Sequence, residues 1–79
     1  MKILDLGCGK RKVKDSVGVD LNNNADICHD LNKFPYPFPD YSFDVVYLSH
    51  SLEHLDDFGK VLSECIRIVK KNGRIKIFL

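Results

Sequence analysis

Two glycines and an aspartate are the first residues of this sequence that could contact a ligand. Gly7 and Gly9 follow a short apolar run, and Asp20 ends the next one. After a strand, glycines let backbone N–H groups approach a ligand at the carboxyl edge of a sheet. A carboxylate ending the adjacent strand can accept hydrogen bonds from both ribose hydroxyls. Together they predict a nucleoside-like ligand, although each glycine alone would equally suit a tight strand exit.

The glycine turn differs from that of dinucleotide-binding sites. Those sites carry a third glycine three residues after the second, so that a helix can hold the pyrophosphate, and here that position is Lys12. The connection to Ser16 is short and basic, and we interpret its charges as a solvated loop. The ligand is therefore predicted to lack a pyrophosphate.

A metal-binding pattern begins at His50. His50, Glu53 and His54 match His-x-x-Glu-His, in which two imidazoles ligate zinc and the glutamate acts as a base. A zinc hydrolase is therefore an alternative. Against it, Glu64 is the one evident downstream third ligand, Cys28–His29 is distant, and the glycine turn would be unexplained.

Apolar runs predict the strands that position these residues. Lys2–Leu6, Ser16–Asp20, Asp44–Leu48 and Arg74–Leu79 are short and rich in strand-forming side chains. Asp26–His29 is a weaker candidate, because the connection from Asp20 is too short for a crossover helix and suits an irregular edge segment.

One long helix is predicted to begin near Asp57. Asp56 or Asp57 can cap its start, Lys70–Lys71 suit the negative end of its dipole, and Asn72–Gly73 can take positive φ at its end. A shorter helix is expected over about Ser51–Leu55. The predicted buried face of the long helix consists of Phe58, Val61, Leu62, Cys65, Ile66 and Val69.

The segment Asp30–Phe43 holds all three prolines, interleaved with aromatic residues, which excludes a helix or a central strand. We expect Phe38 and Phe43 to fold back over one sheet face, and a ligand wall is the alternative.

The order of elements predicts a single α/β domain over residues 1–79. Its expected architecture is a minimal Rossmann-like, open and mainly parallel sheet of four or five strands with one long and one short helix. Parallel sheets need cover on both faces, and the sequence offers few helices. One face should be covered by the proline-rich loop or left to another chain.

Composition excludes several classes of partner. Twelve Lys and Arg against eleven Asp and Glu give a net charge of +1, which implies neither nucleic acid nor anionic lipid. No apolar run approaches the roughly 20 residues of a membrane span. Cys8, Cys28 and Cys65 are widely spaced, so we expect free thiols and a cytoplasmic location.

The ordered motifs resemble class I, S-adenosylmethionine-dependent methyltransferases, in particular the small methyltransferase-domain group. The resemblance covers nearly the whole chain, and it is fairly specific through the order and spacing of its motifs. They are Ile-Leu-Asp-Leu-Gly-Cys-Gly at 3–9, Val-Gly-Val-Asp at 17–20, Asp-Leu at 30–31, Phe-Asp-Val-Val at 43–46, Leu-Glu-His-Leu at 52–55 and Ile-Val-Lys-Lys-Asn-Gly-Arg at 68–74.

The resemblance implies S-adenosylmethionine as the cofactor. Asp5, Gly7 and Gly9 would line its methionine end. The glycine signature of the family usually has a further glycine where this chain has Arg11, which makes the geometry of the turn an open question.

The remaining site residues are assigned in the same way. Asp20 would bind the ribose hydroxyls, and Asp30 with Leu31 would contact the adenine, although Asp30 could equally begin an Asx-type turn. His50 is the candidate for a base or a positioning group. His54 is interpreted as a packing residue.

The implied function is methyl transfer to an unidentified, small-molecule acceptor. The chain lacks the two strands that usually follow the fifth in this family, so a fragment or a non-catalytic S-adenosylmethionine-binding module that needs a partner is the alternative. A terminal apolar strand beside a thinly covered face predicts a homo-oligomer or a complex completed by a partner.

Overall fold

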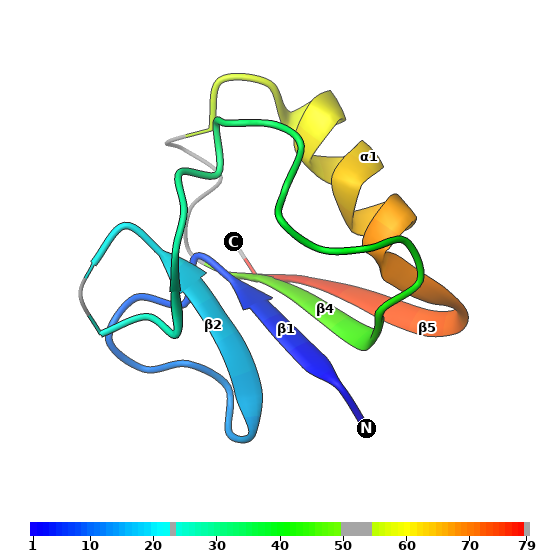
Figure 1. Ribbon diagram of the computed structural model, residues 1–79, viewed down its shortest axis with the longest axis horizontal. Helices are drawn as coiled ribbons and strands as arrows, with labels where there is room; N and C mark the ends of the chain where they lie inside the picture. Colours follow the sequence, from blue (N-terminus) through cyan, green and yellow to red (C-terminus); the bar gives the residue numbers. More distant parts are fainter. Residues whose placement is uncertain (23, 50–54, 79) are drawn as a thin grey trace.

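A five-stranded sheet is the framework of the computed structural model, which describes residues 1–22, 24–49 and 55–78. The strand order is β3-β2-β1-β4-β5, and all neighbouring strands are parallel (Figure 1). The predicted open, Rossmann-like α/β sheet is thus confirmed. The elements are β1 (Ile3–Leu6), β2 (Ser16–Asp20), β3 (Ile27–Cys28), β4 (Phe43–Ser49), α1 (Phe58–Ile68) and β5 (Val69–Phe78).

Central strand β1 sets the register of the hydrophobic core. Leu4 pairs with Val17 of β2 and Val46 of β4, and two residues later Leu6 pairs with Val19 and Leu48. Because side chains alternate along a strand, these residues share one face of the sheet. The fully buried members of this face are Leu4, Leu6, Val19, Val46 and Leu48.

Helix α1 covers that face with a narrow stripe. Val61, Cys65 and Ile68 are fully buried, whereas Phe58 is 39% and Ile66 59% exposed. The prediction that Phe58 and Ile66 lie on the buried face was therefore wrong. The stripe follows spacings of four and three residues, which is enough to cover a sheet only a few strands wide.

The two ends of α1 differ in how well the sequence predicted them. Asp57 is the N-cap, and its Oδ1 accepts a hydrogen bond from the Lys60 N–H at 3.1 Å, as predicted. The predicted ending at Asn72–Gly73 was wrong, because Val69 is already extended and begins β5. The Arg67 and Ile68 carbonyls accept hydrogen bonds from Tyr41 and Ser42 instead.

Gly73 serves close packing of the backbone. It lies inside β5, near an irregularity in the pairing with β4 between Phe43 and Val45. A Cβ at Gly73 would lie 2.5 Å from the Asp44 carbonyl oxygen. The glycine thus lets β5 approach β4 and provides no positive-φ helix end.

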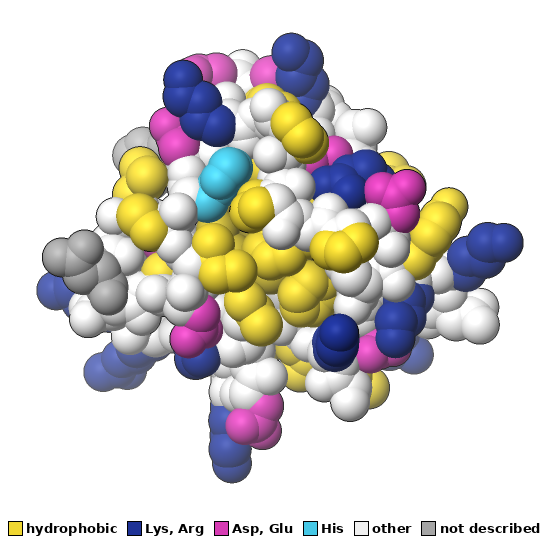
Figure 2. Space-filling view, viewed as in Figure 1, with side chains coloured by type: hydrophobic (Ala, Val, Ile, Leu, Met, Phe, Trp, Pro, Cys, Tyr) yellow, Lys and Arg dark blue, Asp and Glu magenta, His cyan; other side chains and the backbone are white. Residues whose placement is uncertain are grey.

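The proline-rich loop shares the face that α1 covers (Figure 1). Phe38 meets Phe43 edge to face with ring centroids 5.4 Å apart, and Tyr36 is 2% exposed. The expectation that Phe38 and Phe43 cover the sheet is confirmed. Figure 2 shows hydrophobic side chains gathered at the centre of the view, where Figure 1 places the gap between α1 and the sheet.

The opposite face of the sheet is covered only in part by the described residues. Over β1 and β2, the loop after Leu6 places Val13 against Asp5 and Lys12 against Gly18. Over β4 and β5, an open hollow remains.

The predicted short helix over Ser51–Leu55 falls almost entirely outside the described residues. Among the described residues, no helix combines the length and the apolar character that a membrane span requires.

The Arg67 guanidinium fastens the proline-rich loop to α1. It donates to both carboxylate oxygens of Glu64, to the Tyr36 and Phe38 carbonyls and to Asp40, at 2.7–3.2 Å. The Tyr36 N–H donates to Glu64 Oε1 at 2.6 Å. These hydrogen bonds lower the pKa of Glu64, with the Arg67 contribution the largest.

Replacement of Glu64 by glutamine tests this cluster. We expect Glu64→Gln to lower the free energy of unfolding by about 1–2 kcal/mol near neutral pH, because charge-assisted hydrogen bonds become neutral ones. Because the pKa of Glu64 is lowered in the folded state, its ionised carboxylate contributes its full stabilisation above the pKa of the unfolded state, near 4.5. The contribution becomes smaller as the pH falls below that value. The wild-type protein should therefore lose more stability on acidification than the variant.

Urea denaturation at about pH 7 and about pH 4 provides the measurement. The exposed Asp56→Asn change is the matched control and should stay within about 0.5 kcal/mol of wild type. An equal loss of stability in wild type and Glu64→Gln on acidification would contradict the assignment.

Candidate functional site at the carboxyl edge of the sheet

The glycine turn leaves β1 at the edge where β1 and β2 both end. Gly7 has φ of 75° and Gly9 φ of 60°, a left-handed backbone that favours glycine. The N–H groups of Gly7 and Cys8 both donate to the Val19 carbonyl, at 2.8 and 3.3 Å. The turn is therefore attached to the end of β2.

Asp20 joins the glycine turn to the end of β2. Its Oδ2 accepts a hydrogen bond from the Gly9 N–H at 2.8 Å, and its Oδ1 accepts one from the Leu21 N–H at 2.7 Å. An ionised carboxylate offers about four lone-pair sites, so both oxygens retain capacity for ligand hydroxyls. The two features that pointed to a nucleoside are thus in direct contact.

Asn22 supports the same turn and was missed by sequence reasoning. Its Nδ2 donates to the Gly9 carbonyl at 3.2 Å, and its Oδ1 accepts from the Asn24 N–H at 2.8 Å. The available signal was the asparagine run that follows Asp20, which indicated only that the strand had ended.

A cavity of about 210 Å³ adjoins Asp20. Asp20, Asp30 and Leu31, the residues assigned to the nucleoside part of the ligand, all line it. Pockets for drug-sized ligands span about 300–1,000 Å³, so this one suits part of a ligand, such as a planar ring. The lining residues are Asp20, Leu21, His29, Asp30, Leu31, Asn32 and Leu55.

Asp30 forms a turn and also lines the cavity. Its Oδ1 accepts from the Asn32 N–H at 2.9 Å, and its carbonyl accepts from the Lys33 N–H at 2.9 Å. This is the Asx-type turn that stood as the alternative reading of Asp30. The turn directs the backbone so that Leu31 borders the cavity.

His29 is a second lining residue that the sequence reasoning did not place in the site. Its backbone N–H donates to the Asp20 carbonyl at 3.1 Å, and its ring Nε2–H donates to the Lys33 carbonyl at 3.0 Å. The ring also meets Tyr36 edge to face, with centroids 5.7 Å apart. These contacts fix the orientation of the imidazole and, when it is neutral, leave Nδ1 as an acceptor.

Tyr36 holds the backbone of Leu31, one of the residues that line the cavity. Its hydroxyl donates to the Leu31 carbonyl at 2.8 Å in a buried hydrogen bond. Burial, the largest cause, raises the pKa of Tyr36 well above its usual range, so the phenol stays protonated and remains a donor. The aromatic loop therefore supports the site in addition to covering the sheet.

Asp5, on β1, and Cys8, between the two glycines of the turn, are both buried. Asp5 is 1% exposed, and its Oδ2 accepts from the Val13 N–H at 2.9 Å, so its carboxylate supports the loop after β1. Burial, followed by the charges of Asp5 and Asp20, raises the pKa of the Cys8 thiol. A protonated, buried thiol acts as a small filling side chain and is a poor nucleophile.

The candidate base and the zinc pattern fall outside the described residues, since both involve His50–His54. Ser49, the last residue of β4, directly precedes this stretch. Within residues 1–22, 24–49 and 55–78, no group of three or more His, Cys, Asp or Glu side chains is arranged to hold a metal ion.

Comparison with known proteins identifies the family. A family model described as "Methyltransferase domain" matches residues 4–77. Demethylmenaquinone methyltransferase of Listeria welshimeri is 37% identical over 70 residues, which make up 89% of this chain and 28% of the relative. The enzymes of that name from Listeria monocytogenes (strain EGD-e) and Bacillus cytotoxicus are 37% and 34% identical, with 89% of this chain and 27% of each relative covered.

The chain spans just over a quarter of the length of these relatives. No solved structure matches it. The matched range runs from β1 into β5 and includes the glycine turn, Asp20 and the Asp30–Leu31 turn. The chain belongs to the class I, S-adenosylmethionine-dependent methyltransferase domain family.

Proposed function

We propose that this chain binds S-adenosylmethionine at the carboxyl edge of β1 and β2 and supports methyl transfer to a small-molecule acceptor. The observation that carries the proposal is the hydrogen bond from the Gly9 N–H to Asp20 Oδ2 beside the cavity. It brings the predicted ribose-binding carboxylate and the glycine turn into one site, in a chain of the matching family.

The chemistry of the cavity fits the nucleoside half of the cofactor. Asp20 would accept hydrogen bonds from the ribose hydroxyls, and the apolar side chains of Leu31 and Leu55 would lie against the adenine ring. The methionine half would follow Gly7 and Gly9. The acidic side chains at this edge suit a cofactor that carries sulfonium and ammonium charges.

S-adenosylmethionine, when bound, supplies a methyl group on a positively charged sulfur, which is already activated for displacement. The residues around it therefore have to orient the acceptor and exclude competing geometries. We assign to His50 the role of base or positioning group, because it follows Ser49 at the carboxyl end of β4. The His50 imidazole would accept the proton that the acceptor loses on methylation.

The relatives suggest which acceptor to assay first. Their names describe methylation of demethylmenaquinone, a small-molecule substrate. The family match gives no support to the zinc-hydrolase alternative through His50, Glu53 and His54.

A second candidate function is cofactor binding without turnover by this chain alone. The open hollow on β4 and β5 favours it, since the described residues leave part of the sheet uncovered. We propose accordingly that the chain works as a homo-oligomer or with a partner.

Cys8, Cys28 and Cys65 are all free, which supports a cytoplasmic location.

Asp20→Asn tests the cofactor site. We expect its Kd for S-adenosylmethionine, measured by calorimetry, to rise about 10- to 100-fold, because loss of the charge weakens the hydrogen bonds to the ribose hydroxyls. The exposed Asp56→Asn variant should bind like wild type. Unchanged binding by Asp20→Asn would remove the basis of the proposal.

An assay of S-adenosylhomocysteine formation with demethylmenaquinone then separates the two candidate functions. Turnover by the chain alone supports the enzyme. Cofactor binding without turnover supports the binding module.

Tyr36→Phe tests how the aromatic loop supports the cavity. Loss of the hydroxyl leaves the Leu31 carbonyl without its buried donor, which should cost about 1–2 kcal/mol of stability. We expect S-adenosylmethionine affinity to fall about two- to tenfold. Tyr41→Phe is the control, because Tyr41 is 56% exposed. A loss of stability with unchanged affinity would show that Tyr36 does not position Leu31.

A further inference from the structure

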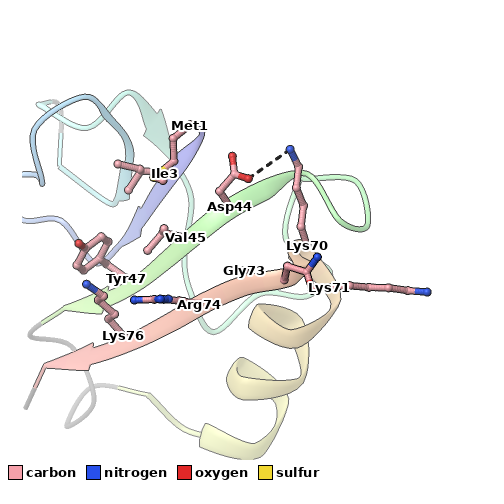
Figure 3. Close-up of a pocket in the computed structure, with 11 residues that line it drawn as sticks. Met1, Ile3, Asp44, Val45, Tyr47, Lys70, Lys71, Gly73, Arg74 and Lys76 are labelled. Carbon is pink, nitrogen blue, oxygen red and sulfur yellow. Dashed lines mark ion pairs between the residues drawn. The ribbon is translucent and has the colours of Figure 1, made fainter.

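The sheet face opposite α1 contains an open hollow. Its volume is about 720 Å³, and it lies over β4, β5 and the start of β1 (Figure 3). Ile3, Val45 and Tyr47 supply its apolar floor, and Met1, which is 92% exposed, lies at its edge. The cofactor site lies at the carboxyl edge of β1 and β2, separate from this hollow, which entered the proposed function only as an uncovered part of the sheet.

Aromatic stacking extends the apolar floor toward the end of β5. Tyr47 and Phe78 stack with ring centroids 5.7 Å apart and an interplanar angle of 8°. Phe78 remains 45% exposed. The floor and this pair form a continuous apolar strip that another element could bury.

Cationic side chains surround the strip. Lys70, Lys71, Arg74 and Lys76 line the hollow, and Asp44 is the carboxylate among its described lining residues. Asp44 is already engaged by the Lys2 N–H at 2.8 Å and by Lys70 at 3.6 Å (Figure 3).

We call the four cations that line the hollow its rim, and three of them carry positive charge that no carboxylate compensates in the described part of the chain. Lys76 lies over the Tyr47 ring, with its Nζ 5.6 Å from the centroid. Within the described part of the chain, no carboxylate pairs with Lys71, Arg74 or Lys76. The surface thus combines an apolar floor with an excess of positive charge at its border.

We propose that this hollow docks an acidic amphipathic helix of a partner protein. Apolar side chains of the helix would cover Val45, Tyr47 and Phe78, and its carboxylates would reach Arg74 and Lys76. A parallel sheet needs cover on both faces, and a helix supplies it without leaving backbone groups unpaired. Complementary charge along the border would fix the orientation of the helix and speed its association.

Two other occupants fit the hollow less well. A second copy docked through the same face would place the four rim cations against their own equivalents, because a twofold interface is self-complementary. An anionic membrane would attract the charges, but its flat surface would leave the recessed apolar floor unburied.

A pair of synthetic peptides tests the proposal in the absence of S-adenosylmethionine. The first is a helix of about 18 residues, roughly 27 Å long, with leucine along one face and glutamate on the other. The second keeps the leucines and replaces every glutamate by lysine. Fluorescence anisotropy of the labelled peptides should show binding of the acidic peptide and at least tenfold weaker binding of the basic one.

Two double variants with the same change of net charge locate the binding site. Arg74→Glu with Lys76→Glu should weaken binding of the acidic peptide at least tenfold. Lys14→Glu with Lys33→Glu, at exposed positions away from the hollow, should change it less than twofold. Tyr47→Ser should also weaken binding, because the apolar floor is then interrupted. Circular dichroism establishes that each variant is folded.

Several results would overturn the proposal. The first is no binding of the acidic peptide, and the second is an equal loss of peptide affinity in both double variants. The third is a dimer in sedimentation that Arg74→Glu with Lys76→Glu dissociates. The fourth is binding of phosphatidylglycerol vesicles through these cations in place of the peptide. A calorimetric titration with S-adenosylmethionine on the same variants keeps this test separate from the cofactor proposal. Loss of cofactor binding with intact peptide binding would count against the cofactor proposal and leave the docking proposal standing.

Discussion

The guanidinium of Arg67 links the helix, the proline-rich loop and the ligand cavity. Its five hydrogen bonds hold Glu64 and the loop residues Tyr36, Phe38 and Asp40 around one point on α1. Three prolines cannot donate backbone hydrogen bonds, so a loop that contains them depends on side chains for its attachment. Arg67 meets that need because its planar group presents several donors in fixed directions.

The core of the fold was predictable where the signal is local. The apolar runs indicated β1, β2, β4 and the second half of β5, because β-branched and aromatic residues mark strands within a few positions. The end of α1 was not predictable in this way, because Asn-Gly is a common helix ending when the sequence is considered alone. The glycine at position 73 is required instead by the Asp44 carbonyl of β4, a contact between segments far apart in sequence. The narrow buried stripe of α1 likewise depends on the width of the sheet that it covers.

In the candidate site too, residues with a local sequence signal were predictable and residues that depend on distant contacts were not. The proximity of the glycine turn to Asp20 was predictable because both follow strands that end at one edge, and a hydrogen bond joins Gly9 to Asp20. Tyr36 was not found, because its role depends on a loop that folds back so that its hydroxyl reaches Leu31 and its N–H reaches Glu64. His29 was missed because β3, the strand that directly precedes it, is only two residues long, which is too little for a clear pattern.

The hydrogen bond between Gly9 and Asp20 also affects the entropy of ligand binding. Glycine has the greatest backbone freedom of any residue, so an unsupported turn with Gly7 and Gly9 would lose much of that freedom on binding. Here the Val19 carbonyl, the Asp20 carboxylate and the Asn22 amide hold the turn before a ligand arrives. The entropic cost of ordering the turn is thus met during folding, and a larger share of the interaction energy remains for affinity.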